Sequence, residues 1–164
     1  MPVTTAATLL ALVGVFDLVG TIGSGWLTDR FDPRLLLGAY YALRGVSLAL
    51  LVPLFGADLN ASVLAFVIFY GLDWVATVPP TLALTREAFG AAAPIVFGWI
   101  FASHQLGASF AALVAGLARD ALGSYDAAWY GGAALCVVGA VLSLSVRRST
   151  GLIVRAQPAA EGAG

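Results

Sequence analysis

Five long apolar runs, separated by short polar segments, constrain this chain more than any other feature of its sequence. A bilayer core of about 30 Å is crossed by about 20 apolar residues in a helix. Backbone groups in lipid must bond within the protein, and no run alternates apolar and polar residues as a strand would. We therefore predict an all-α, polytopic membrane helix bundle of five transmembrane helices, at 3–27, 35–55, 62–85, 95–118 and 126–146.

The composition fits a chain surrounded by a lipid bilayer. Hydrophobic residues make up 60% of it and charged residues 10%, whereas soluble domains carry about 25% charged residues. The net charge of -1 offers no basic surface for nucleic acid, so we expect no nucleic-acid partner. Its single cysteine, Cys136, cannot form an internal disulfide. The sequence has no metal-ligand cluster, H-E-x-x-H or G-x-S-x-G motif, so we expect no metal, no cofactor and no enzymatic activity.

The distribution of arginine predicts the orientation. The loops on one side of the bundle and the C-terminal segment hold Arg30, Arg34, Arg86, Arg147, Arg148 and Arg155, while the other side holds only Arg119. Positive residues gather on the cytoplasmic side, so we expect a cytoplasmic C-terminus in a bacterial inner (plasma) membrane protein. Residues 1–148 should form the bundle, and residues 149–164, rich in Ala and Gly, a disordered cytoplasmic tail.

Four ionisable residues interrupt the apolar runs: Asp17, Arg44, Asp73 and His104. Each costs about 2.5–3.5 kcal/mol to insert. A helical rise of 1.5 Å per residue puts each of them about 15–20 Å from its cytoplasmic loop, near the middle of the membrane. Transporters place substrate and coupling ions at this depth.

Each of these residues has a structural and a functional interpretation. Asp17 and Arg44 lie at similar depth on consecutive antiparallel helices, so they are candidates for a structural ion pair, with Asp17 also a candidate site residue. Asp73, followed by Trp74, is favoured as a substrate or proton site. His104, followed by Gln105, either packs or binds, and an imidazole on a water-filled path would suit proton transfer.

Two further patterns bear on packing and movement. Pro79 and Pro80 remove backbone hydrogen bonds within the third apolar run. They predict a kink, which is either a static bend or a gating bend near Asp73. Small residues, including Gly20 and Gly23 in the first run, would let helix backbones approach closely.

A short charged loop between the first two apolar runs carries a family resemblance. Gly25, Asp29, Arg30 and Arg34 resemble the loop signature of the major facilitator superfamily, although Asp32 and Pro33 stand where the usual pattern has Gly and a basic residue. That departure suits the second copy of the signature. The chain then resembles helices eight to twelve. Its stretches Tyr40–Gly45 and Gly71–Thr81 are similar to bacterial members of the monocarboxylate-porter or oxalate/formate-antiporter type.

The resemblance implies a rocker-switch transporter with a central cavity between two bundles. Asp17, Asp73 and His104 would become site residues, whereas Arg44 would fall on a peripheral helix. Gly25, Asp29, Arg30 and Arg34 would form a conformational latch toward helices that this chain lacks.

We therefore expect part of a secondary transporter that moves a small solute, such as an organic anion or monocarboxylate, with protons. Its candidate substrate or proton residues are Asp73, His104, Asp17, Gln105 and Trp74. Its partners would be the N-terminal helices of the same transporter or a second copy of the chain. The alternative is a non-transporting membrane protein, such as an assembly partner or a gene remnant.

Overall fold

The computed structural model describes residues 3–54 and 61–147, and all their regular elements are helical, which confirms the all-α bundle. The helices are α1 (Val3–Thr28), α2 (Pro33–Leu54), α3 (Ala61–Asp73), α4 (Val78–Phe89), the short 3-10 helix η1 (Gly90–Ala92), α5 (Ala93–Leu122) and α6 (Asp126–Ser145). The expected tail at 149–164 lies outside the described residues.

Local sequence explains where these helices begin and end. Pro33 opens α2, where a missing N–H is harmless, and the Asp32 carboxylate accepts a hydrogen bond from the Arg34 backbone N–H at 3.0 Å. Gly123 ends α5 with a left-handed φ of 76°, and its N–H donates to the Arg119 carbonyl. Gly90 ends α4 with a positive φ of 52°. Only glycine adopts such angles without strain.

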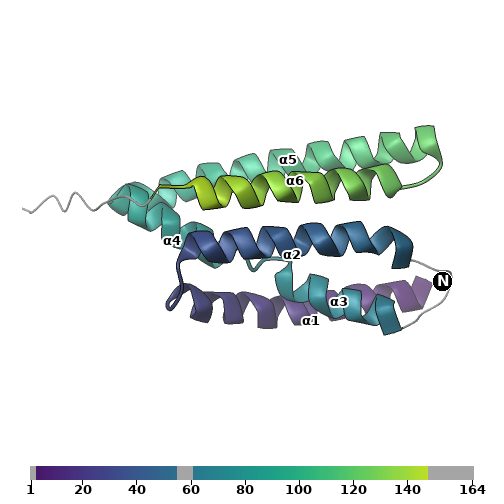
Figure 1. Ribbon diagram of the computed structural model, residues 1–164, viewed down its shortest axis with the longest axis horizontal. Helices are drawn as coiled ribbons and strands as arrows, with labels where there is room; N and C mark the ends of the chain where they lie inside the picture. The colour runs from purple at the N-terminus through teal and green to yellow at the C-terminus, as the bar shows by residue number, and fades with distance from the viewer. Residues whose placement is uncertain (1–2, 55–60, 148–164) are drawn as a thin grey trace, which may run out of the picture.

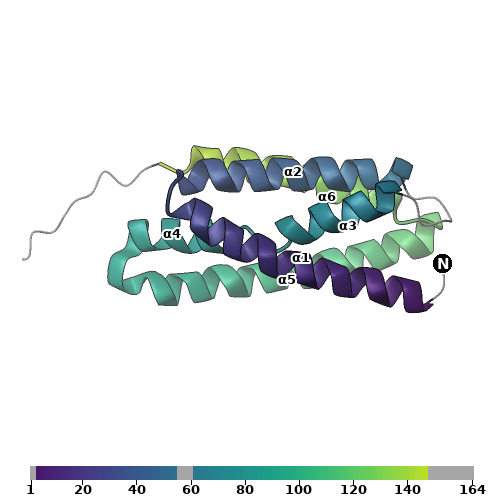
Figure 2. The same ribbon diagram turned by 90° about the horizontal axis from the view of Figure 1, so that it is seen from below.

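The helices run back and forth along one axis (Figures 1 and 2). In Figure 1, α2 lies between α6 on one side and the pair of α1 and α3 on the other. In Figure 2, α5 lies on the side of the bundle away from α2 and α6, next to α4. The buried apolar residues accordingly gather around α2 and α3, at Leu37, Leu48, Leu51, Val63 and Val67.

Four stretches of the described residues are long and apolar enough to cross a membrane: Val3–Thr28, Pro33–Pro53, Val63–Leu122 and Asp126–Ser145. The third stretch contains two of the runs expected from the sequence, 62–85 and 95–118. It reverses direction at η1, after α4 and before α5 (Figure 2). Two of the expected spans are thus parts of one continuous, folded-back stretch.

α1 and α3 approach each other closely, and glycine makes this approach possible. A Cβ atom added to Gly20 would lie 1.9 Å from the Leu72 carbonyl oxygen, and one added to Gly71 would lie 2.8 Å from the Val13 carbonyl oxygen. Neither position has room for a methyl group. The two helices therefore meet backbone to backbone, as small residues in membrane helices allow.

Candidate functional site

The chain leaves helical structure at residues 74–77, between α3 and α4. Pro79 and Pro80 lie just after this break, in the first turn of α4, where proline disrupts no hydrogen bond. The structure thus places the interruption one turn earlier than the prolines suggested. Pro80 is completely buried, so the start of α4 is firmly packed.

Side chains of α1 satisfy backbone groups that the break leaves without helical partners. The Asp17 carboxylate accepts a hydrogen bond from the Val75 N–H at 3.0 Å. The Ser24 hydroxyl, which is 1% exposed, donates to the Ala76 carbonyl at 2.5 Å. Discontinuous helices are tolerated at membrane depth when neighbouring groups supply such bonds.

Arg44 of α2 binds the start of the break, at the end of α3. Its Nε lies 2.8 Å from Oδ2 of Asp73 in an ion pair. Its Nη2 donates to the carbonyls of Asp73 and Trp74. The last carbonyls of a helix lack helical donors and carry partial negative charge, so a guanidinium fits there.

The expected ion pair between Asp17 and Arg44 is wrong, because each residue has a different partner. Arg44 pairs with Asp73, whereas Asp17 accepts from Val75 and, at 3.4 Å, from the Thr21 hydroxyl. Similar depth fixes a position along the bundle axis but not the direction of a side chain. In the structure α2 packs against α3 and α4 much more extensively than against α1.

A cavity of about 560 Å³ lies between α2, the break and α5. Of the expected site residues, Trp74, His104 and Gln105 line it together with Arg44. Asp73 adjoins the cavity through its ion pair with Arg44. The remaining lining residues are Tyr41, Val75, Thr77, Val78, Thr81, Phe97, Ile100, Phe101 and Ser103.

Asp17 lies outside this set. It supports the break from α1 and is not among the residues that line the cavity. Conversely, Arg44 enters the cavity wall although the sequence favoured it as a structural partner. Tyr41 was missed entirely, but its spacing of three residues from Arg44 places both on one helix face and would have indicated it.

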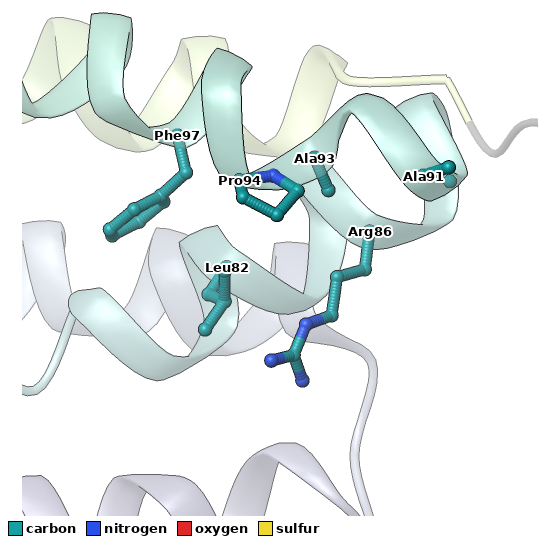
Figure 3. Close-up of a pocket in the computed structure, with 7 residues that line it drawn as sticks. Leu82, Arg86, Ala91, Ala93, Pro94 and Phe97 are labelled. Carbon is teal, nitrogen blue, oxygen red and sulfur yellow. The ribbon is translucent and has the colours of Figure 1, made fainter.

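A second, smaller pocket of about 480 Å³ lies where α4 turns into α5 (Figure 3). Pro94 and Phe97 of α5 lie near Leu82 and Arg86 of α4. Its lining holds one charged side chain and only Phe97 in common with the larger cavity. The larger cavity, which gathers an arginine, a histidine and a glutamine, is the better candidate site.

Two arginines, Arg30 and Arg34, make side-chain contacts in the charged loop between α1 and α2. Arg34 pairs with Asp32 at 2.6 Å and donates to the Val146 carbonyl at 3.1 Å. Arg30 donates to the Trp26 carbonyl and lies 3.9 Å above the ring of Trp26. These contacts connect the loop to the ends of α1 and α6.

Three proteins resemble this chain over most of its length. Monocarboxylate transporter 13 of Rattus norvegicus is 30% identical over 165 residues, which cover 92% of this chain and 38% of that protein. Monocarboxylate transporter 13 of Bos taurus is 30% identical, with coverage of 82% and 32%. The uncharacterized MFS-type transporter YcxA of Bacillus subtilis (strain 168) is 28% identical, with coverage of 71% and 30%. No family model and no solved structure matches the chain.

The apolar helices and the likeness to proteins named as transporters define an integral membrane protein. The chain belongs to the major facilitator superfamily, as its Gly25–Arg34 loop indicated. It spans less than two fifths of the length of each of these relatives.

Proposed function

We propose that this chain is part of a secondary transporter that carries a small organic anion, of the monocarboxylate kind, together with protons by a rocker-switch movement. The observation that carries the proposal is a guanidinium in the wall of a membrane cavity. Arg44 lines that cavity while two backbone carbonyls and a carboxylate fix its position. Two relatives named as monocarboxylate transporters support the same substrate class.

The wall of the cavity suits an anion with a short apolar body. Tyr41, Trp74, Phe97, Ile100 and Phe101 supply apolar surface, and a few polar groups among such side chains are typical of ligand sites. Arg44 has Nη1 hydrogens that bind no acceptor among the described residues. A solute carboxylate would bind this guanidinium by charge-assisted hydrogen bonds.

His104 and Gln105 would act from the α5 side of the cavity. Gln105 offers an amide to the solute, and the imidazole of His104, whose ring nitrogens can accept and donate a proton, would exchange protons with water in the cavity. The interruption at residues 74–77, followed by Pro79 and Pro80, would permit α4 and α5 to move relative to α3.

We further propose the orientation and assembly that the sequence indicated. The C-terminus would be cytoplasmic, in a bacterial inner membrane, and the chain would supply helices eight to twelve. The first bundle of the same transporter or a second copy of this chain would face the cavity. Gly25, Asp29, Arg30 and Arg34 would then form a latch toward that partner bundle.

The test is uptake of radiolabelled propionate into membrane vesicles, with and without an inward proton gradient. It compares the 164-residue chain with any longer form that its gene encodes. A tenfold or greater loss of uptake in Trp74→Ala and His104→Ala is expected. Asp120→Asn, at an exposed acid on α5 that does not line the cavity, is the matched control and should leave uptake unchanged.

Uptake that does not change with the proton gradient would refute coupling to protons but would still support anion transport. Absence of uptake in every form would refute the transport proposal and favour a non-transporting assembly partner.

A further inference from the structure

The Arg44–Asp73 pair connects the cavity with the buried end of α3. On one side, Arg44 lines the cavity and is 19% exposed. On the other side, the Asp73 side chain is 7% exposed. Its Oδ2 accepts from Nε of Arg44, whereas its buried Oδ1 has no hydrogen-bond partner among the described residues. A buried carboxylate oxygen without a donor is costly, and a bound proton would reduce that cost.

The charge of the pair sets what can bind beside it. Ionised Arg44 and ionised Asp73 sum to zero. A carboxylate bound to Arg44 would leave one net negative charge within the membrane, where an unpaired charge is strongly disfavoured. One proton on Asp73 restores neutrality. Binding of the anion and binding of the proton are therefore expected to favour each other.

Other ionisable groups surround Asp73 but fit this role less well. Tyr70 of α3 and Cys136 of α6 lie close enough to interact electrostatically with Asp73, but both are neutral acids at neutral pH. Asp17 of α1 already accepts two hydrogen bonds. His104 of α5 lines the cavity and is a competing proton acceptor, which the test must distinguish from Asp73.

We propose that a bound organic anion takes the place of the Asp73 carboxylate on Arg44 and that Asp73 takes up one proton from the cavity water in the same step. This inference rests on the proposed function. The hydrogen bond from Nε of Arg44 passes from Asp73 Oδ2 to the anion, and one proton from the cavity water binds to the released Asp73 carboxylate. The Asp73 and Trp74 carbonyls continue to hold Nη2, so the guanidinium keeps its place.

The test measures protons and anion together, using the full chain in lipid nanodiscs in a weakly buffered solution with a pH indicator. The probe is radiolabelled propionate, and empty nanodiscs correct for partitioning into lipid. The wild-type chain should take up about one proton per bound propionate, with affinity falling about tenfold per pH unit once free Asp73 is ionised. In Asp73→Asn, propionate should still bind but proton uptake should disappear.

Two variants and one spectroscopic signal test whether the proton binds to Asp73. Asp120→Asn is the matched carboxylate control and should behave as wild type. In His104→Ala less propionate should bind, but the ratio of protons taken up to propionate bound should stay at about one. Wild-type chain should also gain the infrared C=O stretch of a protonated carboxylic acid when propionate binds, a signal that requires no variant to fold.

The outcomes separate the two proposals. Propionate binding without proton uptake or infrared change would overturn the exchange at Arg44 but leave the anion site standing. Proton uptake that persists in Asp73→Asn and disappears in His104→Ala would also overturn it. Absence of propionate binding to the wild-type chain would overturn the proposed function itself, and this inference with it.

Discussion

The contact between α1 and α3 gives the most direct test of the fold, through Gly20→Ala. The added methyl carbon would lie 1.9 Å from the Leu72 carbonyl oxygen, whereas ordinary contact begins near 3.4 Å. Relieving this overlap requires the two backbones to separate by about 1.5 Å, the difference between these distances. The alanine would otherwise have gained about 0.5–1 kcal/mol as a better helix former than glycine.

The separation should cost more than that gain. Overpacking alone costs about 1–3 kcal/mol. It would also stretch the bonds from Ser24 to Ala76 and from Asp17 to Val75, which join α1 to the break directly after α3 and contribute about 0.5–1.5 kcal/mol each. We therefore expect a net loss of about 2–4 kcal/mol for Gly20→Ala, because the gain in helix propensity offsets only part of these terms.

Thermal unfolding in detergent, followed by labelling of the buried thiol of Cys136, would measure this loss. At about 2–4 °C per kcal/mol for a chain of this length, Tm should fall by roughly 4–16 °C. The matched control is Gly23→Ala, one turn further along α1, where an added Cβ meets nothing within 4 Å. That variant should match or slightly exceed the wild-type Tm. Equal Tm values for the two variants would refute the close approach of α1 and α3.

Three further predictions use the same unfolding assay. Arg44→Gln leaves Asp73 as an unpaired buried charge, so it should cost about 3–5 kcal/mol. The double variant Arg44→Gln with Asp73→Asn should recover most of this loss. A double variant whose loss of stability equals the sum of the two single losses would contradict the pairing. Ser24→Ala leaves a buried carbonyl of the break without its donor and should cost about 1–3 kcal/mol, while an unchanged Tm would show that this bond is not formed. Gly123→Ala forces a side chain into a left-handed conformation at the end of α5, so a loss of about 1–2 kcal/mol is expected, and any stabilisation would contradict that geometry.

Much of the fold followed from the sequence because the membrane leaves few alternatives. Run length and the demand for internal hydrogen bonding were sufficient to predict an all-α bundle. The loop at Gly25–Arg34 was sufficient to indicate the superfamily. Neither prediction required knowledge of which side chains meet.

The site was harder to predict, because it depends on the direction in which each side chain points. Depth along the membrane suggested a partner for Arg44 on α1, but the crossing of the helices gave it Asp73 on α3. The interruption at 74–77 was also displaced from Pro79. Proline marks where a helix can begin, while the break itself is stabilised by polar side chains from distant parts of the sequence.

The break at residues 74–77, between α3 and α4, also constrains the order in which the chain can enter a membrane. Its exposed peptide groups would be poorly tolerated in lipid on their own. Their partners Asp17, Ser24 and Arg44 all belong to helices that are synthesised earlier. During synthesis from the N-terminus, α1 and α2 are therefore already in place to receive the third pass when it emerges. A circular permutation that delayed α1 or α2 until after α4 would expose those peptide groups to lipid during insertion.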